Sequence, residues 1–337
     1  MDILTKSFYA FILSAIITNL LRKSNILATP NERSAHTKPT PNIGGVAIIL
    51  STSVLGYIYI IPSLDQSVSI SLILGIVILS IIGLLDDCSK KGLSYKLRLI
   101  IQLICSFLFT KAVGCIDLPI HIMPENIKFI IEFFFTTTTF MFLINASNFA
   151  DGLNGLLSGC AMISCIFLAI MNQHIYVNSL SCMILAGGIL GFFIFNFYFG
   201  KIFLGDVGST FLGALIGIIT INASFNYENP FYTWIVQIGT LSFILVDIAI
   251  TIFYRLSRKL SIFTPHRDFL SHILNRGGLS HTKVTLIYIT GTIISGSLAI
   301  IYHKNQISIQ IWLTIMILMH SLKIITIYIF ANRKNLL

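Results

Sequence analysis

The chain has 337 residues, of which 55% are hydrophobic and only 10% are charged, and its mean hydropathy is +0.87. Soluble globular domains carry charge on about a quarter of their residues, so this composition excludes a soluble domain. Apolar runs of about 17 to 25 residues recur along the whole chain, and each is long enough to cross a hydrocarbon core of about 30 Å as a helix. The sequence therefore predicts one all-α, polytopic membrane domain over residues 1–337.

Apolar windows of this length predict about eleven transmembrane helices. The first window has no small-residue cleavage signature after it, so we expect a retained span and not a removed signal peptide. The six cysteines fall mostly inside apolar runs without metal-type spacing, which predicts buried thiols and no disulfide framework. The expected spans lie near residues 3–21, 44–61, 70–85, 99–115, 128–145, 156–171, 179–198, 209–222, 232–253, 284–302 and 307–330.

The basic residues that give the net charge of +9 lie mainly in the connections between these spans. The connections form two alternating sets, and one set contains all but five of the 22 Lys and Arg residues. By the positive-inside rule this set is cytoplasmic, which places the N-terminus outside and the C-terminus inside. Membrane orientation therefore explains the excess of basic over acidic residues, and no nucleic-acid partner is expected. The five exceptions are Lys6, Lys111, Lys128, Lys304 and Lys323.

The first inner loop contains NERSAHTKPTPNIGG, residues 31–45. Its prolines, Pro39 and Pro41, disfavour helix. Lys38 offers a point charge that suits a phosphate group. A loop lysine that only sets membrane orientation is the alternative interpretation.

The third expected span ends in GLLDDCSKKGLSYKLR, residues 83–98. Asp86 and Asp87 are adjacent carboxylates at the end of an apolar helix, so they repel one another. A divalent cation or a cationic substrate group would relieve that repulsion. The alternative is interfacial solvation with Lys90 and Lys91 as helical partners. Because carboxylates at the membrane edge are expensive, the pair predicts a functional site.

The stretch NASNFADGLNGL, residues 145–156, places three Asn, one Asp and two Gly between two apolar runs. Asn145 and Asn148 are three positions apart and are expected on one helical face. Asp151 and Asn154 then fall in the loop. An ordinary Asn/Gly turn is the alternative, but polar groups against a membrane span are costly unless they have a function.

A fourth polar stretch, FGKIFLGDVGSTFLG, covers residues 199–213. Asp206 lies between glycines, and Ser209 and Thr210 are expected to cap the following helix. Mg²⁺ takes few protein ligands together with phosphate oxygens, so a single acid in a glycine-rich turn suits it. A plain Asp–Gly turn is equally compatible with these residues.

Within the ninth expected span, Asp247 interrupts an apolar run. Intramembrane acids pair with a basic residue or line a polar cavity. Pairing with Arg255 and a place in the same cavity as the other acids are both open.

The largest inner loop, residues 254–283, contains TPHRDFLSHILNRGGLSHTK. Arg267 lies close in sequence to His266 and His272, and its planar fork of donors matches the oxygens of a pyrophosphate. A solvated loop histidine is the ordinary alternative. The cluster lies on the side that the basic residues mark as cytoplasmic.

All of these polar stretches fall on that same predicted side. Carboxylates, amides and basic groups at one membrane face are typical of a metal-assisted phosphoryl-transfer site that is open to a soluble nucleotide and to a lipid. A polytopic membrane transporter is the alternative function, but it would place ionisable groups near the bilayer midplane.

The sequences and the order of five motifs resemble those of the polyprenyl-phosphate N-acetylaminosugar 1-phosphate transferase family, of the glycosyltransferase family 4 type. The motifs are RSAHTKPTPNIGG, GLLDD, NASNFADGLNGL, FLGDVGSTFLG and the late Pro-His-Arg loop, and they span residues 31–283. That family includes enzymes that initiate O-antigen, enterobacterial common antigen and wall teichoic acid, and the translocase of peptidoglycan synthesis.

The resemblance implies transfer of a sugar 1-phosphate from a UDP-N-acetylaminosugar to undecaprenyl phosphate, with release of UMP and with Mg²⁺ or Mn²⁺. It implies a multi-pass protein of the bacterial inner membrane with a cytoplasmic site, and it leaves a homodimer open. Asp86 and Asp87 match the family's paired catalytic acids, and Asn148 and Asp206 match its metal-holding positions.

The remaining site residues match positions that contact substrate. Asp151 and Asn154 correspond to positions near the nucleotide, Arg267 to the arginine that grips the diphosphate, and Lys38 to a phosphate-binding lysine. His266 and His272 join Arg267 in the same expected substrate-binding loop.

One motif departs from relatives that use UDP-GlcNAc. Those relatives often have a His-x-His-His run where this chain has Phe269-Leu270-Ser271-His272. The loop is more similar to the subgroup that uses UDP-activated 6-deoxy sugars such as FucNAc or QuiNAc. The apolar Phe269 and Leu270 suit a methyl group better than a hydroxyl. The sequence therefore predicts a UDP-FucNAc-like or UDP-QuiNAc-like donor in preference to UDP-GlcNAc.

Overall fold

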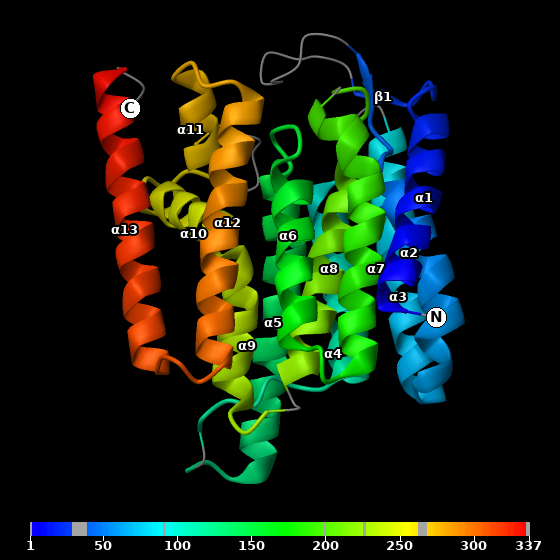
Figure 1. Ribbon diagram of the computed structural model, residues 1–337, viewed down its shortest axis with the longest axis vertical. Coiled ribbons are helices and arrows are strands. Elements are labelled where there is room, and N and C mark those ends of the chain that lie inside the picture. Colours follow the sequence, from blue (N-terminus) through cyan, green and yellow to red (C-terminus); the bar gives the residue numbers. More distant parts are fainter. Residues whose placement is uncertain are drawn as a thin grey trace.

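A computed structural model of the protein describes residues 2–28, 39–89, 92–120, 122–198, 200–224, 227–261 and 268–334. The fold is a helical bundle whose long helices lie side by side along one axis (Figure 1). Two short strands pair antiparallel. The elements in chain order are α1 (Ile3–Leu21), β1 (Leu27–Ala28), β2 (Thr40–Pro41), α2 (Gly45–Tyr59), η1 (Ile61–Ser63), α3 (Gln66–Cys88), α4 (Tyr95–Val113), α5 (Glu125–Ala150), α6 (Leu156–Met171), α7 (Tyr176–Phe193), η2 (Ile194–Tyr198), α8 (Gly205–Ser224), α9 (Pro230–Ile238), η3 (Gly239–Leu241), α10 (Ser242–Ser257), α11 (Leu270–Arg276), α12 (His281–His303) and α13 (Ile309–Arg333).

The predicted all-α, multi-pass architecture is confirmed. Over the described residues, nine helical segments are long and apolar enough to cross a membrane. The helix α6 is shorter, with 16 residues, and α4 has 19 residues but includes Lys96, Arg98 and Lys111. Each expected span coincides with helical structure, because a helix satisfies its own backbone polar groups in an apolar medium.

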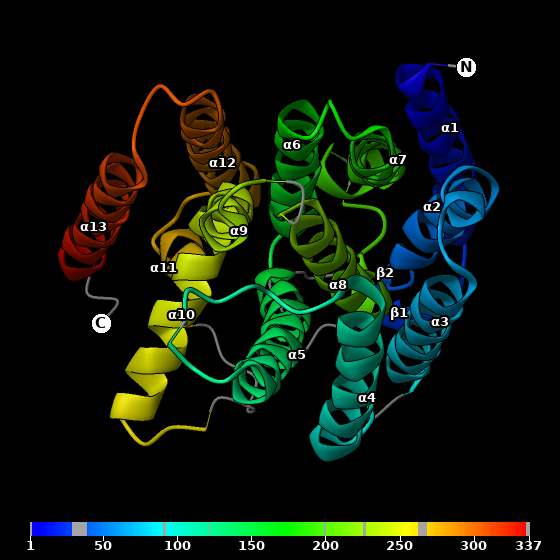
Figure 2. The ribbon, with the colours of Figure 1, turned by 90° about the horizontal axis from the view of Figure 1, so that it is seen from below.

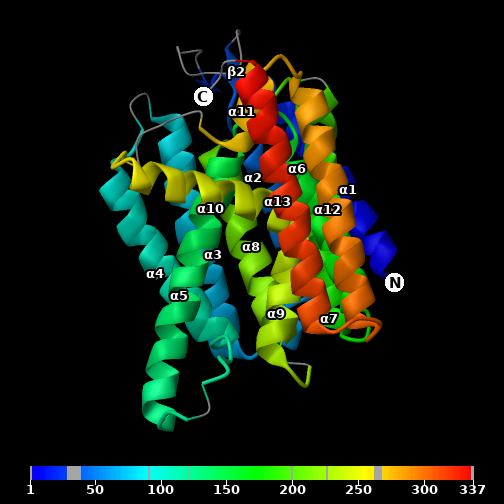
Figure 3. The same ribbon diagram turned by 90° about the vertical axis from the view of Figure 1, so that its left-hand side faces the viewer.

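The expected span over residues 232–253 falls within one apolar helical segment, Pro230–Ser257, but the helix is interrupted inside it. The chain forms α9, then the 3₁₀ turn η3, and then α10. Figure 3 shows α10 running across the bundle, whereas its neighbours run along it. The turn falls at Gly239, where a Cβ atom would lie 2.6 Å from the Trp312 ring of α13. The glycine therefore permits the turn to approach the Trp312 ring closely.

The helix α8 is the centre of the bundle. In its apolar window 83% of the residues are buried, against 22% for α1 and for α13. Figure 2 shows α8 enclosed by its neighbours, while α1 and α13 lie at opposite edges. Residues at the start of α8 are therefore held from several sides.

Motif glycines allow two helices to approach the start of α8 at backbone distance. A Cβ atom at Gly45 of α2 would lie 2.2 Å from the Cα atom of Gly208. A Cβ atom at Gly83 of α3 would lie 2.5 Å from the Cα atom of Val207. Any larger residue would separate these helices, so the glycines of GLLDD, PNIGG and GDVG bring three motifs together.

The polar motifs lie at one end of the bundle. The ends of α3 and α5 and the starts of α8 and α12 are at the upper end in Figure 1, near the C-terminus, and the N-terminus lies lower down. This arrangement agrees with the prediction that the polar stretches share one face of the membrane.

Cysteine usage also agrees with the prediction. All six cysteines are free, and four of them are buried.

Candidate active site

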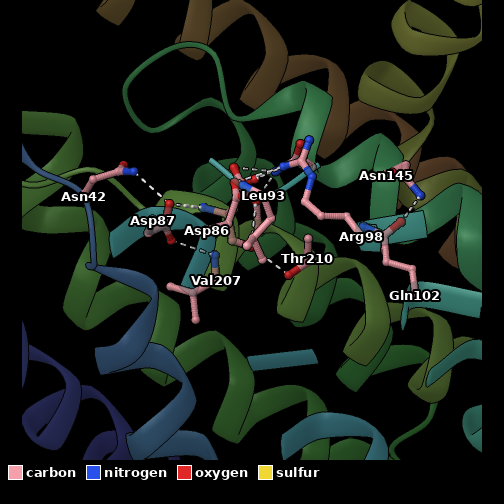
Figure 4. A network of polar contacts seen from close by, with 12 residues as sticks. Asn42, Asp86, Asp87, Leu93, Arg98, Gln102, Asn145, Val207 and Thr210 are labelled. Atoms are coloured by element: carbon pink, nitrogen blue, oxygen red, sulfur yellow. Dashed lines mark hydrogen bonds and ion pairs between the residues drawn. The ribbon is translucent and has the colours of Figure 1, made fainter. Parts of the chain in front are cut away.

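Asp87, at the end of α3, caps the N-terminus of α8 (Figure 4). Its Oδ1 atom accepts the backbone N–H of Asp206 at 3.0 Å, and its Oδ2 atom accepts that of Val207 at 2.9 Å. The Asn42 side chain donates to Oδ1 at 2.8 Å. Gly205 has a φ of +77°, and a Cβ atom there would lie 2.5 Å from Oδ2. A carboxylate that accepts the first N–H groups of a helix, which have no acceptor within the helix, stabilises its first turn, here that of α8.

The expected capping role of Ser209 and Thr210 is wrong. Helix α8 begins at Gly205, four residues before Ser209, and Asp87 supplies the cap from another helix. The Thr210 hydroxyl instead donates to the carbonyl oxygen of Asp206 at 2.7 Å. Asp206 therefore lies in the first turn of a helix and not in a loop.

Asp86 has a different environment from its neighbour. Its side chain is 12% exposed, and its Oδ2 atom pairs with the Arg98 guanidinium at 3.1 Å. The same Nη1 atom of Arg98 forms an ion pair with Asp206. The backbone N–H of Leu93 donates to Oδ1 of Asp86. The two adjacent acids therefore divide, one facing the α8 backbone and one facing the polar pocket.

The amides of α5 complete this pocket. Asn148 donates to Oδ1 of Asp206 at 2.9 Å and to the Ser209 hydroxyl at 3.1 Å. Asn145 donates to Oε1 of Gln102 at 2.8 Å. The predicted common helical face of Asn145 and Asn148 is thus confirmed, since both point to elements on the same side of α5.

These side chains line one pocket with a volume of about 40 Å³, which is space for about three groups the size of a water molecule. Polar and charged groups gather on one wall, and apolar side chains of α3, α4 and α5 form the rest. The lining residues are Leu79, Ile82, Gly83, Asp86, Tyr95, Arg98, Leu99, Gln102, Asn145, Asn148, Phe149, Asp206 and Thr210.

Asp151 lies where α5 ends, in the loop that the sequence predicted. Burial raises the pKa of Asp151 well above its usual 3.8, and the nearby carboxylates of Asp206 and Asp87 raise it further. A cation bound beside these carboxylates would offset their repulsion and favour the ionised form of Asp151. Asp151 therefore belongs to the same electrostatic cluster as the paired acids.

The loop after Asp151 is tied to two other elements. The carbonyl oxygen of Asn154 accepts the Thr285 hydroxyl of α12 at 2.8 Å. The N–H of Gly155 donates to Oδ1 of Asn196 at 2.6 Å, and Gly155 has a φ of +75°. These contacts fix the path of the chain from α5 into α6.

His272 of α11 meets this loop. A Cβ atom added to Gly152 would lie 2.2 Å from Nε2 of His272, so the imidazole rests on the Gly152 backbone. The Phe269 ring is 6% exposed and packs against Phe149, with ring centroids 6.0 Å apart. Phe269 is therefore part of the core, which weakens the expectation that its ring contacts the donor sugar.

The structure confirms the predicted convergence for the residues it describes. Four of them share direct contacts or a common partner, and three more lie on the adjoining loop and on α11. Lys38, His266 and Arg267 lie outside the described residues. The four are Asp86, Asp87, Asn148 and Asp206, and the three are Asp151, Asn154 and His272.

Sequence reasoning missed Arg98 as a site residue and treated it only as an orientation charge. Arg98 and Gln102 are four positions apart on α4, so they lie on one face of the helix. That spacing was the available signal. Asn42, within the PNIGG motif, was missed as well, because nothing local shows that its partner is Asp87.

The donor set fits a hard divalent cation. Among the described parts of the chain, no three His, Cys, Asp or Glu side chains gather in a metal-type cluster. Asp86 and Asp206 nevertheless share one cationic group, the Arg98 guanidinium, and Asn148 contacts Asp206. Two carboxylates and an amide suit Mg²⁺, which takes few protein ligands and completes its shell with water and phosphate oxygens.

Comparison with known families matches residues 69–224 to glycosyl transferase family 4. This segment runs from α3 to the end of α8 and contains Asp86, Asp87, Asn148 and Asp206.

Full-length relatives resemble the chain over most of its length. A probable undecaprenyl-phosphate N-acetylglucosaminyl 1-phosphate transferase of Bacillus subtilis is 28% identical, over 91% of this chain and 84% of the relative. A decaprenyl-phosphate N-acetylglucosaminephosphotransferase of Mycobacterium leprae is 27% identical, over 84% and 78%. A phospho-N-acetylmuramoyl-pentapeptide-transferase of Staphylococcus saprophyticus is 29% identical, over 85% and 93%. The chain is a multi-pass membrane protein whose residues 69–224 match glycosyl transferase family 4, the family type that its motifs resemble.

Proposed function

We propose that the protein transfers an N-acetylaminosugar 1-phosphate from a UDP-sugar to undecaprenyl phosphate, releases UMP, and uses Mg²⁺ or Mn²⁺. The observation that carries the proposal is the meeting of Asp86, Asp206, Asn148 and Arg98 in one pocket at the end of the bundle. Relatives named for sugar-phosphate transfer to polyprenyl phosphates support the reaction class.

In this reaction an oxygen of the lipid phosphate forms a bond to the phosphorus that carries the sugar. The bond from that phosphorus to the bridging oxygen breaks, and UMP leaves with the electron pair. Such transfers depend mainly on positioning and on charge neutralisation. A divalent cation bound by Asp86, Asp206 and Asn148 would neutralise charge on the diphosphate.

The protein's own groups have separable tasks in this scheme. Asp87 fixes the first turn of α8 and with it the position of Asp206. Arg98 is one-third exposed and offers a second positive charge beside the carboxylates. A transporter is not favoured, because Asp86 lies in the last turn of α3, Asn148 in the last turn of α5 and Asp206 in the first turn of α8, and none lies midway along its helix.

The proposed orientation places the site in the cytoplasm of a bacterium, with the N-terminus outside the plasma membrane and the C-terminus inside. The distribution of Lys and Arg supports it. A cytoplasmic site would meet soluble UDP-sugar and the phosphate of a lipid in the inner leaflet. The product would then initiate a lipid-linked cell-surface glycan.

The donor sugar is the finer part of the proposal. The late loop is similar to the 6-deoxy subgroup, whereas two of the relatives are named for N-acetylglucosamine. We include UDP-FucNAc, UDP-QuiNAc and UDP-GlcNAc as donors to be compared.

The test is an assay on membranes that contain the protein. Labelled UDP-sugars are supplied with undecaprenyl phosphate, and label in the lipid extract and UMP are measured together. We expect equal amounts of both products, a requirement for a divalent cation, and loss of activity in Asp206→Asn. Asp65→Asn is a matched control, since Asp65 precedes α3 at the other end of the helix from Asp86. No labelled lipid from any donor, or full activity of Asp206→Asn at saturating Mg²⁺, would overturn the proposal.

A further inference from the structure

A buried carboxylate of α10 holds the start of α11, the helix that carries His272. Asp247 is 3% exposed. Its Oδ1 atom accepts the backbone N–H of Leu270 at 2.7 Å, and its Oδ2 atom accepts that of Ser271 at 3.1 Å. The Tyr288 hydroxyl of α12 donates to Oδ2 at 2.6 Å. Three donors from two other helices therefore meet one buried carboxylate, which is a strong arrangement.

A buried cation from α13 completes this cluster. Lys323 is 8% exposed, and its Nζ atom donates to the carbonyl oxygen of Phe243 at 2.5 Å. The same atom lies 4.4 Å from the ring centroid of Phe243 and 4.5 Å from that of Tyr288. The Asp247 carboxylate attracts the Lys323 ammonium electrostatically. Burying an acid costs less free energy when a cation lies close to it.

A second residue of α10 holds the same segment further out. Arg255 donates from Nε and Nη2 to the carbonyl oxygen of Ser261 at 3.0 Å and 2.7 Å. Its Nη1 atom forms an ion pair with Asp268. The expected pairing of Asp247 with Arg255 is therefore wrong, since the two residues hold different parts of the chain between 261 and 271. Helix α10 anchors both ends of that stretch.

The position of α11 decides where His272 lies. The helix has only seven residues, so its orientation depends on the contacts at its ends. From this helix, the His272 imidazole rests on Gly152, in the loop that also carries Asp151.

We propose that Asp247 is a positioning residue, which acts through the first turn of α11 to hold His272 beside Gly152 in the sugar-nucleotide half of the site. The ligand of His272 rests on the proposed function, whereas the position of His272 rests only on the contacts of Asp247.

The test compares two variants with a matched control. Asp247→Asn keeps one acceptor oxygen but turns an N–H donor toward a backbone N–H donor. Tyr288→Phe removes one donor and leaves the backbone contacts, so it remains informative if the first variant folds poorly. Thr251→Val is the control, because Thr251 is equally buried on α10 and donates only to the carbonyl oxygen of Asp247.

Two measurements are made on the full-length protein in detergent. Amide hydrogen exchange of residues 268–276 needs no substrate, so it reports on positioning even if no UDP-sugar is accepted. Steady-state kinetics then give kcat, KM for the UDP-sugar and KM for the lipid phosphate.

In Asp247→Asn we expect the amide exchange rate of residues 268–276 to rise about tenfold, because one hydrogen bond to a charged group is lost. Exchange in the rest of the bundle should not change. KM for the UDP-sugar should rise by a similar factor, while KM for the lipid stays within about twofold. Tyr288→Phe should show a smaller rise, and Thr251→Val none. Unchanged exchange of residues 268–276 in Asp247→Asn, or an equal rise of both KM values, would overturn the proposal.

Discussion

The two adjacent acids should differ when each is changed to the isosteric amide. Asp87 gives both carboxylate oxygens to backbone N–H groups of α8 and also accepts from Asn42. Asp86 contacts Arg98 and Leu93 and lines the pocket. The same substitution one position apart therefore separates a structural task from a chemical one.

The expected sizes follow from these contacts. In Asp87→Asn one backbone N–H loses its charged acceptor and meets an amide donor, which costs about 2 to 4 kcal/mol of unfolding free energy. In Asp86→Asn the lost pairing with Arg98 is partly solvated, and repulsion between the adjacent acids is relieved. The net change in stability should stay within about 1 kcal/mol. Its effect on turnover should be about 100-fold or more, because charge stabilisation in a phosphoryl transfer contributes several kcal/mol.

The assay is thermal unfolding of both variants in the same detergent, together with UMP release at saturating Mg²⁺. Asp87→Asn should unfold at a clearly lower temperature and lose activity as well, since Asp206 depends on the cap. Asp86→Asn should unfold with the unmodified protein and be nearly inactive. Equal midpoints for the two variants, or a destabilised Asp86→Asn, would refute the division of tasks.

Four further outcomes are expected. Gly83→Ala should lower the unfolding temperature and activity, because its Cβ atom would meet the α8 backbone, whereas Gly56→Ala has only an ordinary contact at 4.0 Å and serves as the control in the same thermal assay. Mg²⁺ should raise the unfolding temperature of the unmodified protein and not that of Asp206→Asn, because an ion stabilises the state that binds it. In EDTA, Asp151→Asn should be more stable than the unmodified protein at about pH 8, and the difference should vanish toward about pH 4. The pKa of Asp151 is raised in the folded protein, so above its unfolded pKa the acid ionises more easily in the unfolded chain, and the folded protein loses stability as the pH rises. Replacing residues 269–272 with His-Ile-His-His should change the ratio of kcat/KM between UDP-GlcNAc and a 6-deoxy donor, and an unchanged ratio would show that the loop does not read the sugar.

The sequence was sufficient to predict the architecture and the gathering of the acids. Spans follow from the length of apolar runs, and their alternation with basic loops places Asp86, Asn148 and Asp206 at one end without any structural information. The motif glycines carry further information that composition alone does not reveal. Gly83 and Gly208 are needed because two backbones touch there, and such contacts depend on the whole bundle.

What could not be predicted depends on long-range partners. Whether Asp86 or Asp87 faces the pocket depends on the rotation of α3 about its axis, which its nearly uniform apolar surface does not reveal. The turn before α10 lies against Trp312, and this contact joins two residues that are far apart in the chain. For Asp247 the sequence left open pairing with Arg255 or a place in the cavity of the other acids, whereas its partners are two backbone N–H groups and the Tyr288 hydroxyl, 23 to 41 positions away.

The cap on α8 has a consequence for how the enzyme is made. Asp87 and the N–H groups that it accepts are separated by 119 and 120 positions. During synthesis α3 has left the ribosome well before α8 emerges, since the chain grows from its N-terminus. The acceptor is thus in place first, and the opening turn of α8 cannot be completed by neighbouring residues of its own. The catalytic centre would therefore assemble late in biogenesis, when α8 enters between α3 and α5, and a nascent chain truncated before α8 would be membrane-inserted but chemically inert.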